Sequence, residues 1–456
     1  MANRIDAQVA IVGAGIVGVA VAYYLSTRHG VRDVAIIDPL DPMSLTSSKS
    51  GENYRNWWPH PAMRALTDHS TDLMEAIAAE TGDRIAMTRR GYALVTRRRQ
   101  PDDLIAELHR GYGAEGGERI RIHETASKSY RPAESGDWRA APDGVDVLCD
   151  PELIRAAFPS YAPDIATVLH IRRAGSISGQ QLGQFMLDAV RERGGRVLRA
   201  RLVGVEAGAP FRLRLEASGA RSELGAAQIV NAAGPHLARV GAMLGESLPV
   251  SCVYQQKIAF EDRLGAIPRT MPFSIDLDGQ TLAWSEEERD VLASDPTTAR
   301  LVAPMRGGIH CRPDGPQQGK WIKLGWAYND TPSDPDGAEP IDPHFPDILL
   351  RAASRLNPGL SAYVGQLPRG AVHYGGYYTM TRENWPLVGP LGARGAFVAG
   401  ALSGYGTMAA AAVGDLTARW MVGAALPPFA ANFAPSRYAD AKLMAALAAE
   451  TSRGVL

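Results

Sequence analysis

A glycine pattern near the start of the chain, followed by an acidic residue, is the first set of residues with a recognisable chemistry. Gly13, Gly15 and Gly18 have the GxGxxG spacing within the sequence GAGIVG. Such a turn lets backbone amides approach a pyrophosphate, and the helix that follows directs unpaired N–H groups at the phosphates. Asp38 lies about 20 residues further on, where a carboxylate can accept hydrogen bonds from ribose hydroxyls. These residues predict a bound dinucleotide and leave FAD and NAD both open.

A lysine inside an apolar segment is the second candidate for chemistry. Residues 319–329 read GKWIKLGWAYN, and their alternation predicts a strand with Lys323 between Trp321 and Trp326. A lysine at this place can protect the edge of a sheet against pairing with another chain. It can also be a buried cation beside a reacting group. The residues of this segment alone favour the edge strand.

The glycine pattern requires a strand before it and a helix after it. Residues 8–12 form a short apolar run, and residues 19–25 continue with helical composition. Residues 34–37 form a second apolar run that ends at Asp38. This order is the strand, turn and helix context in which the pattern binds nucleotides. We therefore expect a Rossmann-type unit at the start of the chain.

Changes in the predicted secondary structure divide the rest of the chain into segments. Short strands and polar loops are expected in two stretches, and helical patterning with a buried strand lies between them. The predicted fold class is α/β, with a Rossmann-type dinucleotide-binding domain and a second, α+β domain built on a large mixed sheet. The first domain takes residues 1–90, 170–247 and 381–456, and the second takes residues 91–169 and 248–380, with an insert at about 284–318.

The composition is that of an ordinary globular protein. The chain has 456 residues, of which 45% are hydrophobic and 21% charged, so it can bury a large core. Its 48 basic and 49 acidic residues nearly cancel, and no net field attracts it to nucleic acid or to an anionic membrane. Small-molecule chemistry is the expected function class.

Cysteine placement and the apolar stretches bear on the compartment. Cys149, Cys252 and Cys311 lie far apart and form no CxxC pair, which argues against disulfides and against a metal site. Glycines interrupt the apolar stretch 9–25 and no small-residue cleavage site follows it, so it is not expected to be a secretory signal. Charged residues interrupt residues 408–425, so this stretch is not expected to span a membrane. We expect a cytoplasmic protein without a metal.

Four separated motifs resemble the superfamily of FAD-dependent amine oxidoreductases that contains D-amino-acid oxidase, glycine oxidase and monomeric sarcosine oxidase. They are VAIVGAGIVGVAVAYYL at the start, IVNAAGP at 229–235, RGAV and YYTMTRENWPLVGP within 369–390, and VAGALSGYGTMAAAAVG at 398–414. The motifs follow the order of the family and span nearly the whole chain. The resemblance implies a GR2-like FAD-binding domain and oxidation of the carbon next to an amine nitrogen.

The resemblance implies roles in FAD binding for residues of each motif. In the first part of the chain, the pyrophosphate would lie against Gly13, Gly15, Ile16, Val17 and Gly18, the ribose at Asp38, and the ribityl and phosphate path along Ser47, Ser48 and Lys49. Further along, the adenine would meet the backbone of Val203, the pyrophosphate would be bordered by Ala233 and Gly234, and the flavin pyrimidine would be wrapped by Gly404, Gly406, Thr407 and Met408.

The resemblance also gives Lys323 an expected function. Monomeric sarcosine oxidases carry a lysine over the flavin in a strand LKIGYH that is followed by DPD. Here IKLGWA at 322–327 precedes DPD at 334–336. A cation beside the flavin stabilises superoxide, which forms as an anion. On this alignment Lys323 is the expected catalytic residue for the reaction with O2.

Three departures from the family pattern change the expected site. Gly376 stands where covalent relatives have a cysteine, so we expect noncovalent FAD. Met408 stands where the sarcosine oxidases have a lysine for the substrate carboxylate, and Ala327 replaces a histidine. The substrate pocket is therefore expected to differ, and sarcosine is not the expected substrate.

Residues 51–59, GENYRNWWP, supply other candidates for substrate binding. Arg55 could bind a carboxylate bidentately. Trp57 and Trp58 could wall an alkylated amine, or they could pack the interface between the domains. Further candidates by position are Tyr254, Trp326 and Tyr378.

The sequence as a whole predicts an FAD-dependent oxidase of a secondary or N-alkylated amine or amino acid, with O2 as acceptor and hydrogen peroxide as product. One alternative is a dehydrogenase of the same fold that passes electrons to a quinone or carrier. Another is a flavoprotein that serves as a binding or assembly factor without amine chemistry. The insert at 284–318 could cover the site or mediate oligomer contacts, and His310 and Arg312 within it are expected to be structural.

Overall fold

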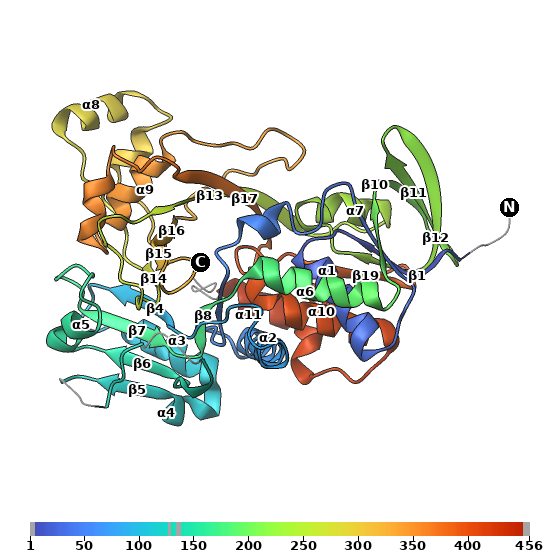
Figure 1. Cartoon of the computed structure of the whole chain (residues 1–456), viewed down its shortest axis with the longest axis horizontal. Helices are drawn as coiled ribbons and strands as arrows, with labels where there is room; N and C mark the ends of the chain where they lie inside the picture. Colours follow the sequence, from blue (N-terminus) through green and yellow to red (C-terminus); the bar gives the residue numbers. More distant parts are fainter. Residues whose placement is uncertain (1–4, 126–128, 134–137, 450–456) are drawn as a thin grey trace.

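Two large sheets with their helices make up the molecule (Figure 1). The computed structural model describes residues 5–125, 129–133 and 138–449. The sheet with the N-terminal strand lies on the right in Figure 1, and the other sheet lies on the left. Two long strands, β13 (Val250–Glu261) and β17 (Val372–Thr381), reach from the second sheet toward the first.

The first sheet has eight strands and a parallel centre. Four consecutive residues of its first strand are buried, as is usual for parallel strands that are covered on both faces. The parallel strands are β1 (Ala7–Val12), β2 (Val34–Asp38), β9 (Arg196–Arg199), β12 (Ala220–Asn231) and β19 (Ala396–Gly400). Antiparallel pairing adds β10 (Arg201–Glu206), β11 (Phe211–Ala217) and β18 (Leu387–Pro390).

Helices cover this sheet and pack closely on each other. The last long helix ends at Gly423, whose φ of 68° is typical of a helix C-terminus. Gly414 of that helix lets the first helix approach, because a Cβ at Gly414 would lie 2.7 Å from Ala20. The helices on one face are α1 (Ile16–Arg28), α6 (Gly179–Glu192) and α10 (Gly406–Val422), with α2 (Pro61–Glu80) and α11 (Ala441–Ala449) packed outside, and α7 (Leu237–Met243) lies on the other face.

The second sheet has nine strands in the order β17-β13-β16-β15-β14-β4-β7-β6-β5. One face packs against α9 (Phe345–Ala353) through an apolar cluster that includes Phe345, Ile258 and Ile322. The remaining strands are β4 (Tyr92–Thr96), β5 (Ile120–His123), β6 (Val145–Leu148), β7 (Thr167–Ile171), β14 (Phe273–Asp276), β15 (Ile309–Pro313) and β16 (Trp321–Gly325). The shorter helices of this region are α3 (Asp102–Tyr112), α4 (Gly116–Arg119), α5 (Pro151–Ala157) and α8 (Glu286–Ser294).

The strand that carries Lys323 is an internal strand. β16 pairs with β13 on one side and with β15 on the other, which places Lys323 between Ala259 and Arg312. The edge-strand interpretation of this lysine is therefore wrong. The alternation within residues 319–329 indicates a strand. It does not indicate whether the strand is internal, because that depends on pairing with β13 and β15, which are not adjacent to it in the pattern.

The segment expected as an insert has two parts. Its last residues form β15, which lies inside the sheet between β14 and β16. Its first residues include α8, which projects at the outer end of the second sheet, away from α1 and β1 (Figure 1). The sheet topology shows which strands belong to each sheet, but it does not define the limits of domains. The assignment of sequence segments to two domains therefore stays a prediction. Among the described residues, no helix has the length and apolar character to cross a membrane.

Candidate active site

The turn after β1 brings three backbone segments into close contact. Gly13 has a φ of 110°, and a Cβ at this residue would lie 2.2 Å from the carbonyl oxygen of Ala232 at the end of β12. A Cβ at Gly18 would lie 1.9 Å from the carbonyl oxygen of Gly13. Only glycine avoids both the strained backbone and the overlap. The turn therefore fixes the distance between β1, β12 and α1.

Two polar side chains hold this turn. The Oδ2 atom of Asp38 accepts a hydrogen bond of 2.8 Å from the N–H of Ala14. The Oγ atom of Ser47 accepts one of 2.9 Å from the N–H of Ile16, in the first turn of α1. By contrast, the Oγ atom of Ser48 is exposed and donates to backbone carbonyls of its own turn, at 2.6 Å from Ser44. Asp38 and Ser47 also line the cavity beside this turn, whereas Ser48 does not.

A crevice runs from this turn toward the second sheet. Its outer cavity has a volume of about 310 Å³ and its inner cavity a volume of about 110 Å³. The two share Gly15, Thr46, Ser47, Ala232, Gly234 and Pro235 as lining residues, so they form one continuous space. The glycine turn and Asp38 lie in the outer cavity with Ala233, and Ile16, Val17 and Lys49 lie in the inner one.

A segment from the second sheet's part of the chain closes the outer cavity. Asp336, which follows β16, lines this cavity together with Arg239 and His236. Its carboxylate makes an ion pair with Arg239 and lies 3.9 Å from the Nδ1 atom of His236. Residues of both parts of the chain therefore enclose the outer cavity.

The inner cavity is lined by cations and small residues. Gly376, Tyr378 and Thr379 of β17 form one wall, and Gly404, Gly406 and Thr407 form the opposite wall at the start of α10. The hydroxyl groups of Ser50 and Thr407 are 2.8 Å apart, which ties the two sides of the cavity together. The lining residues include Lys49 and Lys257 but no aspartate or glutamate. The inner cavity is thus suited to an anionic ligand.

Two residues expected at this site lie elsewhere. Met408 is buried in the core between α1 and α10 and does not line the cavity. Val203 is 38% exposed on β10, and the neighbouring Arg201 and Leu202 line the outer cavity in its place. The expected contact of Val203 was with its backbone, and that expectation stays a prediction.

Lys323 lies in a cluster of four charged side chains beside the inner cavity. Its Nζ atom is 3.2 Å from the Oε2 atom of Glu52 and 3.5 Å from the Oδ1 atom of Asp314. Arg312 contacts Asp314 at 2.8 Å and donates from Nη2 to the carbonyl of Gly51 at 2.8 Å. Burial, and next the charge of Arg312, lower the pKa of Lys323. Two carboxylates therefore balance two cations, and Gly51 connects this cluster to the cavity wall.

Arg55 lies in an aromatic enclosure and has no ionic partner among the residues that the structure describes. Its guanidinium carbon is 4.9 Å from the ring centre of Trp58, 4.7 Å from that of Tyr92 and 5.8 Å from that of Trp57. The residue is 1% exposed, and its Nε and Nη2 atoms have no hydrogen-bond partner. Burial lowers the pKa of this guanidinium. An unsatisfied buried guanidinium is costly unless an anion binds it.

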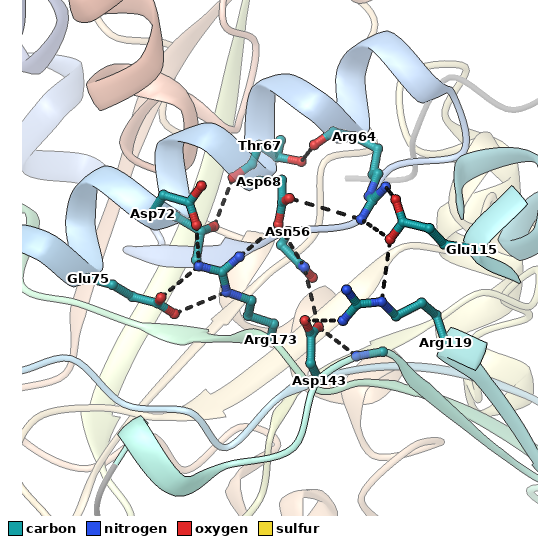
Figure 2. A network of polar contacts seen from close by, with 12 residues as sticks. Asn56, Arg64, Thr67, Asp68, Asp72, Glu75, Glu115, Arg119, Asp143 and Arg173 are labelled. Carbon is teal, nitrogen blue, oxygen red and sulfur yellow. Dashed lines mark hydrogen bonds and ion pairs between the residues drawn. The ribbon is translucent and has the colours of Figure 1, made fainter. Parts of the chain in front are cut away.

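A network of ion pairs holds the segment that carries Arg55 (Figure 2). Asn56, the next residue, donates from Nδ2 to the Oδ1 atom of Asp68 at 3.0 Å. Arg173, adjacent to the small strand pair β3 (Asn53–Arg55) and β8 (Ala174–Ser176), contacts three carboxylates of α2, which are Asp68, Asp72 and Glu75. Arg64 with Glu115, and Arg119 with Asp143, extend the network toward α4. The backbone of Arg55 is thus fixed from both sides.

The remaining expected residues divide between two places. Trp57 and Trp58 are buried around Arg55, and Tyr378 lines the inner cavity. Tyr254 and Trp326 instead line a separate cavity of about 410 Å³ with Phe345 of α9, on the other face of the second sheet. Because successive side chains of a strand alternate between faces, Tyr254 and Lys257 of β13 point to opposite sides.

Comparison with known proteins identifies the family. The family model described as FAD dependent oxidoreductase matches residues 8–420. The chain belongs to this family. The expected cofactor, FAD, and the expected class of enzyme, an FAD-dependent oxidoreductase, are therefore confirmed.

Individual relatives agree with this assignment. Human mitochondrial dimethylglycine dehydrogenase is 24% identical over 442 residues, which cover 95% of this chain and 44% of that protein. The chain thus spans less than half the length of this relative. Among solved structures, glycine oxidase from Geobacillus kaustophilus has a TM-score of 0.70 at 20% identity, with 94% of this chain and 98% of that chain covered. L-proline dehydrogenase from P. horikoshii has a TM-score of 0.69 at 15% identity, with 96% and 98% covered. These likenesses confirm the predicted fold class.

The crevice fits FAD. The close backbone contacts at Gly13 place the N-terminus of α1 beside the crevice, where Gly15, Ile16 and Val17 line the cavity and a pyrophosphate could bind. Asp38 in the outer cavity would accept hydrogen bonds from the ribose of the adenosine half. The inner cavity, between β17 and the start of α10, would take the isoalloxazine. Gly404 is needed there because a Cβ would lie 2.5 Å from the ring of Tyr378.

Residues missed by the sequence prediction include Lys257 and Glu52. Lys257 lies in β13 within the sequence QQKIAFE, and a lysine in an apolar strand was a visible signal, the same one that drew attention to Lys323. Glu52 carried no comparable signal, because its importance depends on contacts with Lys323 and with the N–H of Gly179, which lies 3.0 Å from its Oε1 atom.

We expect Gly13→Ala to weaken FAD binding by roughly tenfold or more, because the residue would combine an unfavourable φ with overlap at Ala232, and such backbone strain costs about 1–3 kcal/mol. Titration of the apoprotein with FAD, followed by flavin fluorescence, measures the affinity. Gly117→Ala in α4 is the matched control, since a Cβ there meets nothing within 4 Å. Equal FAD affinity of the two variants would contradict this account of the turn.

Proposed function

We propose that the chain is an oxidase of amino acids, acting on a secondary or N-alkylated amine nitrogen and using O2 as electron acceptor. Bound FAD would take a hydride from the carbon next to nitrogen, which leaves an imine, and O2 would then return the flavin to its oxidised state as hydrogen peroxide forms. The relatives named above as dehydrogenases or oxidases of glycine, proline and dimethylglycine support a donor of this class.

The observation that carries this proposal is the charge of the inner cavity. Its lining contains two lysines and no carboxylate, and the guanidinium of Arg55, which does not line this cavity, is buried among aromatic side chains with two unpaired donor atoms. A simple cationic amine would find no counter-charge there. An amino acid would bring a carboxylate for the cations, and its nitrogen would bind as the neutral amine that hydride transfer requires. The arrangement therefore favours amino acids over amines without a carboxylate.

Arg55 is the proposed anchor of the substrate carboxylate. Its Nε and Nη2 atoms are free donors, and the flat guanidinium can bind both oxygens of a carboxylate. Trp57 and Trp58 fix the guanidinium by cation–π contacts and exclude water around it. Tyr378 would face the substrate from β17. These side chains bind and orient the substrate and leave the hydride transfer to the flavin.

Lys323 is the proposed cation for the reaction with O2. Its ion-pair partner Glu52 follows Gly51 of the cavity wall, and a cation close to a buried site can stabilise superoxide electrostatically. The ion pairs with Glu52 and Asp314 reduce its net effect. This pairing is the specific observation that favours the second candidate, a dehydrogenase that passes electrons to a quinone or carrier in place of O2.

The proposed mode of FAD binding is noncovalent. The inner cavity has no cysteine or histidine among its lining residues, and Gly376 on β17 packs against the side chain of Lys49. Precipitation with acid should therefore release the yellow flavin into the supernatant. Flavin that stays in the pellet would contradict noncovalent binding.

The proposed function is tested by anaerobic mixing of the purified holoenzyme with a panel of amines. We expect N-alkyl amino acids to bleach the flavin absorbance near its visible maximum, whereas amines of the same shape without a carboxylate should leave it unchanged. Reduction by simple amines alone would contradict the choice of amino acids. Silence across the panel would favour a flavoprotein with a binding or assembly function.

Lys323→Met should slow reoxidation of the reduced flavin by O2 by roughly a hundredfold, the size of effect seen when one stabilising group for an oxyanion is removed. Stopped-flow mixing of the reduced enzyme with O2 measures the rate. Lys320→Met is the matched control, because Lys320 is exposed three residues before Lys323. An unchanged rate in Lys323→Met, with rapid reoxidation by a quinone, would favour the dehydrogenase.

A further inference from the structure

A second buried cation faces the inner cavity without an ionic partner. Lys257 of β13 is 4% exposed and lines the cavity. Its Nζ atom donates a hydrogen bond of 3.2 Å to the Oη atom of Tyr378. In the described part of the chain, no carboxylate lies within 4.0 Å of this ammonium, in contrast to Lys323. A buried ammonium with only a neutral partner is unfavourable until an anion reaches it.

The groups that face Lys257 from neighbouring strands do not supply that anion. Across the sheet, Lys257 is opposite Gly325 on β16 and Tyr374 on β17. His310 of β15 lies one strand further, and burial, together with the charge of Lys257, lowers its pKa to about 3. His310 is therefore neutral at physiological pH. The missing anion has to come from the contents of the cavity.

The ammonium of Lys257 and the hydroxyl of Tyr378 are arranged to bind a carboxylate. An ammonium has three donors, and Lys257 uses one of them on Tyr378. The hydroxyl of Tyr378 accepts that bond and keeps its own proton for donation. Two donors about 3.2 Å apart can each take one oxygen of a carboxylate. Gly404 and Gly376 line the same cavity.

Lys257 and Arg55 contact different tyrosines. The guanidinium of Arg55 is 4.7 Å from the ring centre of Tyr92, and the Nζ atom of Lys257 is 5.1 Å from that of Tyr378. A carboxylate bound by Lys257 and Tyr378 leaves the two unpaired donor atoms of Arg55 without an anion.

We propose that the substrate is an amino acid with two carboxylates, one bound by Arg55 and the other by Lys257 and Tyr378. The inference rests on the proposed function and names the substrate class of that site. Lys257 is then a specificity-determining residue. A substrate with one carboxylate leaves one cation buried and unpaired, so it binds roughly 10- to 100-fold more weakly, the range expected for a lost charged hydrogen bond.

The experiment titrates the oxidised holoenzyme with glutarate and with butyrate, which have similar shapes and differ in the second carboxylate. The perturbation of the flavin absorbance reports binding without turnover. We expect glutarate to bind at least tenfold more tightly than butyrate, and Lys257→Met to reduce the ratio of the two affinities to about one. Lys257→Arg should keep most of the preference, and Lys320→Met, an exposed control, should keep all of it.

Flavin reduction separates this inference from the proposed function. N-methylglutamate and N-methylnorvaline form the matched pair of reducing substrates, and we expect the first to have the higher kcat/KM in the wild-type enzyme. Rapid reduction by both, with equal affinity for glutarate and butyrate, would overturn the second anion site and leave the proposed function intact. Preference for glutarate without reduction by any amine would support the anion site and overturn the oxidase.

The same variants show whether Lys257 acts on the flavin itself. Sulfite forms an adduct with flavin N5, and its affinity reports the electrostatic environment of the ring. If Lys257→Met weakens the sulfite adduct and leaves the ratio of glutarate to butyrate affinity unchanged, the ammonium serves the flavin and the proposal is overturned. If Lys257→Met does not fold, the ratio of glutarate to butyrate affinity in the wild-type enzyme and in Lys257→Arg still shows whether Lys257 binds a substrate carboxylate or acts on the flavin.

Discussion

The contact between Gly13, Gly18 and the carbonyl of Ala232 is the constraint on which the rest of the site depends. It sets the separation of β1, β12 and α1 to a distance that no side chain can occupy. The hydrogen bonds from Ala14 to Asp38 and from Ile16 to Ser47 then attach the second strand and the turn at residues 46–49 to the same point. The joined segments contribute Gly15, Ser47 and Ala232 to the lining of both cavities of the crevice.

Charge is distributed in two different ways around the crevice. At Lys323, two carboxylates meet two cations, and the cluster is close to neutral. At Lys257 and Arg55, the cations are buried with aromatic and hydroxyl partners only. Desolvation penalises a charge of either kind, but only the second kind gains when an anion binds. The charge of Lys323 is thus balanced by carboxylates of the protein, whereas the charges of Lys257 and Arg55 can be balanced by a bound anion.

The parts of the site that depend on local backbone conformation could be predicted from the sequence. The glycine turn, Asp38 and the late glycines are of this kind, since their spacing along the chain determines their geometry. Properties that depend on pairing between distant strands could not be predicted. The strand pattern of residues 319–329, taken alone, favours an edge position for Lys323, whereas the partners that make its strand internal, Ala259 and Arg312, are not adjacent in sequence. Tyr254 and Lys257 are an odd number of residues apart in β13, so their side chains point to opposite faces of the sheet. Tyr254 lines the cavity next to α9, and Lys257 lines the inner cavity. The alternation in the sequence does not specify which face of β13 lines the inner cavity.

The ion pairs of Asp336 have a consequence for how the cofactor is acquired. Asp336 follows β16, yet it encloses the outer cavity together with Arg239 and His236 of the first part of the fold. A ligand that binds only the closed arrangement stabilises that arrangement by mass action. Assembly of the holoprotein is therefore coupled to completion of the chain through this segment: a partly synthesised chain that ends before β16 already has the glycine turn, but it lacks the residue that closes the adenosine end of the site.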